Sequence, residues 1–218
     1  IVASIRDFGL ITENEIIAGG SNIGSDGTGD GLMPKNSMGI SVKGESVISN
    51  NIITSSNIGI NIYEKGGVVV NGNKMYVLTN GLIDSYGLYA KGVDNLTIID
   101  NSIHFAGNTD GTVVNNAVRI EGDDEEGTPA SSIVVSDNFF DIYMPSVDVA
   151  YDNNTWAPMV MNDAIVFYYC EGLEFAENNV TVKYNDITTA YGYDSLYAVS
   201  VRSDAYTFGE VQSKHVII

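Results

Sequence analysis

Five aromatic and basic residues lie at two outward positions, the third residue of a repeated phrase and the residue that follows the phrase, and their side chains are suited to binding sugars. The phrase is a small or apolar residue, an apolar residue, any residue and a second apolar residue, as in Gly87-Leu88-Tyr89-Ala90. Tyrosine rings stack on sugar rings, while Lys and Arg donate hydrogen bonds to hydroxyl or carboxylate oxygens. Alternatively, the aromatic side chains only stabilise a sheet through pairs across strands. On either interpretation, equivalent strands predict one outward stripe, made of Tyr63, Tyr89, Lys91, Arg119 and Tyr168.

Acidic residues suggest a second chemistry, the acid and base pair of glycoside hydrolysis. Asn108-Thr109-Asp110-Gly111 and Gly122-Asp123-Asp124 resemble two motifs of the polygalacturonases, whose aspartates act as acid and base. Here Asp110 and Asp123 are only 13 residues apart (123 − 110), which is less than one repeat of this chain. The Gly-His-Gly and Arg-Ile-Lys phrases of that family are also missing downstream. We therefore interpret the match as chance in an Asn-, Asp- and Gly-rich chain and predict no catalytic residue.

A polysaccharide lyase would need a cation and a basic residue that removes the proton next to a uronate carboxyl group. The basic residues of the repeated phrase are few, and the surrounding negative charge disfavours an anionic substrate. Nucleophilic sites are not expected either, because His104 and His215 lie several repeats apart and Cys170 has no partner in the repeat register. The candidate bases are Arg6, Lys43, Lys91, Arg119 and Arg202.

Two acidic groups could bind Ca²⁺, a cation that prefers six to eight oxygen ligands. One is Asp26 with Asp30, and the other is the run Asp123-Asp124-Glu125-Glu126. Neither group has the spacing of a known Ca²⁺ loop, so solvated loop charge is the simpler interpretation. Ca²⁺ binding is kept as an alternative, and no other cofactor is expected.

The elements that position these residues repeat along the whole chain. A six-residue phrase with an apolar residue at each end and Asn at its fourth position occurs six times, and Lys214 replaces Asn in a seventh copy. Apolar and polar residues alternate with a period of two, Ile and Val are frequent, and Gly, Asn and Asp punctuate the pattern. This pattern predicts an all-β fold, a parallel β-helix of about seven coils that lie about 4.8 Å apart.

The repeated Asn residues are predicted to stack at one corner of successive coils. Stacked side-chain amides donate and accept hydrogen bonds along the rod. Asn also tolerates the left-handed backbone conformation that a tight corner demands. The predicted ladder consists of Asn14, Asn51, Asn73, Asn101, Asn138 and Asn178.

Length and composition fit one acidic solenoid. The repeat runs from end to end, so residues 1–218 are predicted to form a single β-helix domain. Because neither end shows a polar cap, we expect it to be a piece of a longer solenoid. The net charge of −18 disfavours nucleic acid and gives no attraction to an anionic membrane. No apolar run is long enough for membrane insertion, and a single Cys excludes an intrachain disulfide.

Several stretches resemble the right-handed parallel β-helix repeats of pectate-lyase-like proteins and, more closely, of adhesin-like surface proteins of methanogenic archaea. They are SVISNNIITSS (46–56), NLTIIDNSI (95–103) and GLEFAENNVTVKYNDITTAYGYDSLYAVSV (172–201). The resemblance covers nearly the whole chain and brings no catalytic motif with it. It implies an extracellular, surface-attached rod whose partners are neighbouring coils, glycans or other surface components. In an exported protein, the sequons at Asn95, Asn153 and Asn179 would be glycosylation acceptors.

We therefore expect an extracellular or cell-surface rod that acts in attachment or surface architecture without catalysis. A carbohydrate-binding module of a larger protein or of a viral spike is the second hypothesis, and a polysaccharide lyase or hydrolase is the third. The three differ in one observation. A passive rod binds no glycan, a binding module binds without turnover, and an enzyme releases products.

Overall fold

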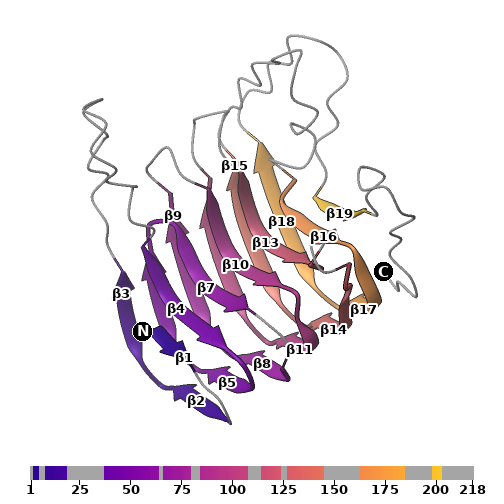
Figure 1. Ribbon diagram of the computed structural model, residues 1–218. Helices are drawn as coiled ribbons and strands as arrows, with labels where there is room; N and C mark the ends of the chain where they lie inside the picture. The colour runs from indigo at the N-terminus through magenta and orange to yellow at the C-terminus, as the bar shows by residue number, and fades with distance from the viewer. Residues whose placement is uncertain are drawn as a thin grey trace, which may run out of the picture.

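The computed structural model consists of three parallel sheets that run along one axis (Figure 1). It describes residues 2–4, 8–18, 37–63, 66–79, 84–107, 114–123, 127–144, 163–184 and 198–202. Sheet A contains β1 (Val2–Ser4), β4 (Met38–Lys43), β7 (Ile58–Tyr63), β10 (Ser85–Lys91), β13 (Asn115–Glu121), β16 (Ile165–Tyr168) and β19 (Val199–Arg202). Sheet B contains β2 (Gly9–Thr12), β5 (Ser46–Ser49), β8 (Val68–Asn71), β11 (Asp94–Ile99), β14 (Ala130–Ser136) and β17 (Cys170–Ala176). Sheet C contains β3 (Glu15–Ala18), β6 (Ile52–Ser55), β9 (Lys74–Leu78), β12 (Ser102–Ala106), β15 (Phe139–Met144) and β18 (Asn179–Tyr184).

Each strand pairs in parallel with the strand three places later in the chain, so three consecutive strands make one coil. The described strands form six complete coils and the first strand of another. The predicted all-β parallel β-helix is therefore confirmed. Its right-handed sense follows the rule for crossovers between parallel strands, which right-twisted strands impose.

The two repeated phrases correspond to two different parts of a coil. The first phrase forms the strand of sheet A, and the Asn phrase crosses the corner from sheet B to sheet C. In the second coil, for example, Ile48 lies in β5 of sheet B and Ile53 in β6 of sheet C, and both side chains are fully buried. The core is a column of such residues from all three sheets, among them Ile48, Ile53, Ile60, Ile62, Leu88, Leu96, Ile98, Ile103, Ile120 and Phe140.

A column of small residues in sheet A lets successive coils approach closely. A Cβ atom placed on Gly87 would lie 2.4 Å from the carbonyl oxygen of Ala117 and 3.0 Å from Cγ2 of Ile103. On Gly59 it would lie 2.4 Å from the carbonyl oxygen of Gly87. These distances explain why the first phrase begins with a small residue.

The predicted Asn ladder is present, and its hydrogen bonds continue without a break through six coils. Each Asn donates from Nδ2 to Oδ1 of the Asn in the next coil, at 2.9 to 3.0 Å. The same Oδ1 accepts the backbone N–H of the preceding ladder Asn, at 2.9 to 3.0 Å. Nδ2 also reaches a carbonyl oxygen of the preceding coil, as from Asn73 to Ile48 at 2.8 Å. The four inner members, Asn51, Asn73, Asn101 and Asn138, are buried.

The left-handed residue at this corner is not the ladder Asn, as the sequence had suggested, but the residue before it. Its φ is 57° at Glu13, 55° at Asn50, and 56° at Asp100, Asp137 and Glu177, and the third coil has Gly72 with φ 63°. The preceding residue makes the turn because the ladder Asn needs its own N–H and side chain for the neighbouring coils. Lys214, the seventh position of this column, lies outside the described residues.

Removing one ladder amide should destabilise the protein far more than removing a neighbouring exposed amide. Asn73→Ala leaves the backbone N–H of Asn51 and the carbonyl oxygen of Ile48 without their buried partner. We expect the free energy of unfolding to fall by about 3 kcal/mol or more. Asn71→Ala, at an exposed position two residues earlier, should change it by less than about 0.5 kcal/mol. Urea unfolding followed by circular dichroism measures both, and equal losses would contradict a structural ladder.

The small-residue column supplies a second stability test. Gly87→Ala should lower the free energy of unfolding by about 2 kcal/mol, because the new methyl group overlaps the backbone of the next coil. Gly67→Ala is the matched control, since a Cβ atom there meets nothing within 4 Å. The same denaturant titration applies, and an unchanged midpoint for Gly87→Ala would show that the coils are less tightly stacked than described.

Candidate functional site

The structure brings the predicted stripe together on the outer side of sheet A. In one column Tyr63 pairs with Lys91, and Tyr168 lies two strands further on, next to Glu121. In the neighbouring column Tyr89 pairs with Arg119. The five side chains thus come from β7, β10, β13 and β16, and all of them are half-buried.

A break in the alternation adds a column that a period of two does not predict. Tyr86 and Tyr89 are three residues apart, yet their rings stack with centroids 4.8 Å apart, so both lie on the outer side. The break occurs at Gly87, where an added Cβ would point toward Ile103 in the core. Asn116 pairs with Tyr86 in this extra column. The sequence shows the small residue, but the resulting change of side can be read only from the folded strands.

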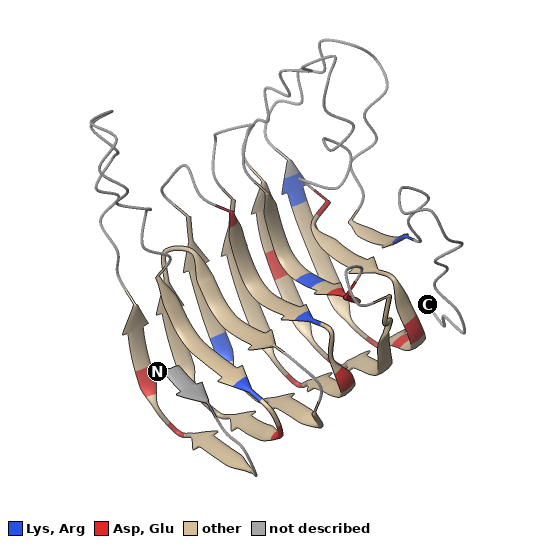
Figure 2. Ribbon diagram, in the orientation of Figure 1, with Lys and Arg blue, Asp and Glu red and all other residues tan. Residues whose placement is uncertain are grey.

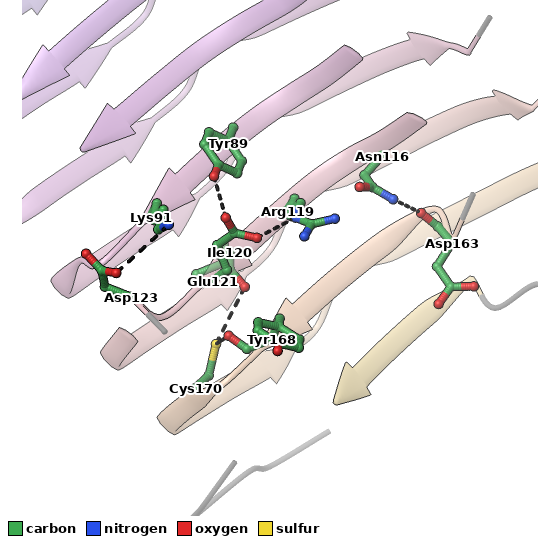
Figure 3. A network of polar contacts seen from close by, with 10 residues as sticks. All are labelled: Tyr89, Lys91, Asn116, Arg119, Ile120, Glu121, Asp123, Asp163, Tyr168 and Cys170. Atoms are coloured by element: carbon green, nitrogen blue, oxygen red, sulfur yellow. Dashed lines mark hydrogen bonds and ion pairs between the residues drawn. The ribbon is translucent and has the colours of Figure 1, made fainter. Parts of the chain in front are cut away.

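Glu121 is the centre of a polar network on this surface (Figure 3). The hydroxyl of Tyr89 donates a short hydrogen bond to Oε1 of Glu121. Nε of Arg119 donates to Oε2 of the same carboxylate at 2.6 Å. Tyr63 packs edge to face against Tyr89, with ring centroids 6.1 Å apart. Glu121 occupies the repeat position equivalent to Lys91, but nothing in the repeat indicates its hydrogen-bond partners.

Two further ion pairs extend the network along sheet A. Nζ of Lys91 lies 3.9 Å from Oδ1 of Asp123. Nη2 of Arg202 lies 2.6 Å from Oδ2 of Asp163, whose side chain is fully buried. The backbone oxygen of Asp163 accepts from Nδ2 of Asn116 at 2.6 Å. Asp163 has no counterpart in the repeated phrases, so no sequence pattern could have identified it.

Burial and neighbouring charges set the protonation states here. Burial, followed by the charge of Glu121 and their hydrogen bond, raises the pKa of Tyr89 well above its usual value. Burial also raises the pKa of Tyr86, with smaller contributions from Asp84 and Glu121. Burial alone would lower the pKa of Arg119, but Glu121, together with Tyr86 and Tyr89, outweighs burial and raises that pKa. At neutral pH Tyr89 is therefore a hydrogen-bond donor and does not act as a base.

Of the remaining chemical candidates, His104 lies apart from this network, whereas Cys170 lies at its edge, beside Ile120 and Tyr168 (Figure 3). His104 is in sheet C, and its Nδ1 is 3.5 Å from Oδ2 of Asp141. Cys170 is fully buried, its thiol faces the carbonyl oxygens of Ile120 and Tyr168 at 3.7 and 3.6 Å, and burial raises its pKa to about 12. Such a thiol is a poor nucleophile, since the thiolate is the reactive form.

Some of the predicted metal-binding and glycosylation residues lie within the described ranges, and others lie outside them. Within the described ranges, no group of three or more His, Cys, Asp or Glu side chains is placed to hold a metal ion. Asn95 and Asn179 are exposed, as glycosylation requires. Outside the described residues lie Arg6, Asp26, Asp30, Asn108 to Gly111, Asp124 to Glu126, Asn153 and His215.

Comparison with known proteins gives no family for this chain. No protein family, curated protein or solved structure matches it. Conclusions about function must therefore come from the surface chemistry of the coils. None of the described residues belongs to a helix that is long and apolar enough to cross a membrane.

The raised tyrosine pKa values predict an alkaline loss of stability. Because folding keeps Tyr86 and Tyr89 protonated, their contribution is complete below pH about 10, where unfolded tyrosine ionises, and it falls as the pH rises further. Each tyrosine adds up to about 1.4 kcal/mol per pH unit to the slope with which the free energy of unfolding falls as the pH rises. Tyr89→Phe should reduce the slope by about half of that amount, averaged over urea unfolding between about pH 9 and about pH 11, because unfolded tyrosine is half ionised at pH about 10. Tyr143→Phe, an exposed tyrosine in sheet C, is the comparator, and equal slopes in all three proteins would refute the assignment.

Proposed function

We propose that this chain is part of a rigid, non-catalytic rod that acts in attachment or surface architecture outside the cell. The observation that supports this proposal is the unbroken Asn ladder, because it links six coils through hydrogen bonds between side-chain amides. A solenoid whose coils are bonded in register resists bending and separates the groups at its two ends. This role is the one that the sequence resemblance to adhesin-like surface proteins of methanogenic archaea implies.

The chemistry of sheet A also supports a structural role. Glu121 is occupied by Tyr89 and Arg119, and Lys91 lies beside Asp123. A network whose donors and acceptors are bonded to one another fixes the shape of a surface. A catalytic site, in contrast, needs a base or acid placed to exchange a proton with a substrate.

A second candidate function is carbohydrate binding by the stripe itself. It is favoured by one observation, namely that Tyr63, Tyr89, Lys91, Arg119 and Tyr168 lie together on four adjacent strands. In this case Tyr63 and Tyr168 would contact a sugar, since Tyr89 and Arg119 are held by Glu121.

Incubation with polysaccharides separates these functions. The purified chain is mixed with plant, cell-wall and host polysaccharides, with and without Ca²⁺, and both retention and newly formed sugar ends are measured. We expect no new sugar ends under any condition. Retention that Tyr63→Ala or Tyr168→Ala abolishes would favour the stripe, and released products would contradict a non-catalytic rod.

A further inference from the structure

The outer side of sheet C carries most of the exposed apolar surface. Eight large hydrophobic side chains are exposed among the described residues, and six of them belong to sheet C. Their exposed fractions range from 39% at Tyr76 to 75% at Ile17. Exposed apolar patches of this kind mark binding surfaces, because water contact with them is unfavourable. The six are Ile17, Ile52, Tyr76, Leu78, Phe139 and Tyr143.

Four rings on adjacent coils form the centre of this surface, and we call Tyr76, His104, Phe139 and Tyr143 the aromatic face. Tyr76 in β9 stacks on His104 in β12, with centroids 5.0 Å apart and planes 7° apart. The centroid of Phe139 in β15 lies 5.9 Å from that of His104. The rings therefore continue along the rod axis from one coil to the next.

Polar groups are interleaved with these rings. Oγ of Ser102 lies 3.1 Å from Nε2 of His104, and Asp141 lies on the Nδ1 side, so both ring nitrogens have a partner. Lys74 and Lys183 are exposed and make no ion pair with any described residue. Basic residues occur on the described strands of sheets A and C and not on those of sheet B (Figure 2). The outer side of sheet C thus combines exposed rings with available donors, whereas Lys91, Arg119 and Arg202 of sheet A each lie beside a carboxylate.

Charge and spacing indicate the kind of molecule that fits. The net charge of −18 repels a second copy of the chain and any polyanion, but it exerts no repulsion on a neutral molecule. Rings at equivalent positions of coils about 4.8 Å apart stack on one another, as Tyr76 and His104 do, so a sugar would pack on the exposed Phe139 and Tyr143. Aromatic rings bordered by ammonium, carboxylate and hydroxyl groups have the chemistry that sugar rings and sugar hydroxyls need.

We propose that the outer side of sheet C binds a neutral polysaccharide, with sugar rings packed on Phe139 and Tyr143 of the aromatic face and hydroxyls bonded to groups such as Lys74 and Asp141. The inference rests on the proposed attachment role and gives it a ligand class. It uses a different sheet from the stripe, so the two sites can be separated by single substitutions.

Affinity electrophoresis tests the proposal with the full chain. The protein is run in native gels that contain hydroxyethyl cellulose, xylan, glucomannan or polygalacturonate, and binding to insoluble cellulose and chitin is measured in parallel. We expect retention by at least one neutral polysaccharide. Phe139→Ala and Tyr143→Ala should each weaken it about tenfold, because each removes one ring contact. Phe8→Ala, which removes an exposed ring outside sheet C, should leave it within about twofold.

Four outcomes would overturn the proposal. Retention by no neutral polysaccharide refutes the ligand class, and retention by polygalacturonate alone indicates a charge-driven interaction. Retention that Tyr63→Ala abolishes and Phe139→Ala leaves unchanged assigns the binding to the stripe. A concentration-dependent dimer in sedimentation that Phe139→Ala dissociates identifies a second copy as the occupant. None of these results produces new sugar ends, so failure here is distinguishable from failure of the non-catalytic rod. Circular dichroism verifies that each variant keeps its strands.

Discussion

The hydrogen bonds of the Asn ladder set the alignment on which the rest of this structure depends. One side-chain oxygen accepts from both the backbone and the side chain of the preceding Asn, so the position of each coil is set relative to its neighbour. Side chains of a strand alternate between core and exterior, and a shift of one residue would exchange the two sets. Correct stacking at one corner therefore decides which residues form the core and which form each outer surface.

That alignment gives the three outer surfaces different chemistry. On sheet A, tyrosine, arginine and glutamate side chains bond to one another, and the result is a fixed and half-buried polar surface. On sheet C, rings and lysines remain exposed. The described strands of sheet B contain no basic residue. One repeated backbone thus supports a surface that stabilises itself and another that is available to a ligand.

The corner next to the ladder also accommodates part of the acidic charge. Glu13, Asp100, Asp137 and Glu177 occupy the left-handed turn position and are exposed. A left-handed conformation is unfavourable for most residues, and short polar side chains such as Asp tolerate it better than Glu does. The strain at Glu13 and Glu177 is borne because the following Asn makes its hydrogen bonds to neighbouring coils. At these positions water screens the carboxylates, and the core stays apolar.

The sequence by itself determined the fold class, the six members of the ladder and the two main columns of the stripe, because these features repeat and a repeat fixes equivalent positions. It did not reveal that Tyr86 joins Tyr89 on the outer side, since the alternation of inward and outward side chains is interrupted at Gly87. Nor did it show that Glu121 binds Tyr89 and Arg119, or that the exposed rings gather on sheet C. Those features depend on contacts between residues about thirty positions apart in the chain, such as Tyr89 with Glu121 at a separation of 32. Only the tertiary structure decides such contacts, because they form when the coils stack in register.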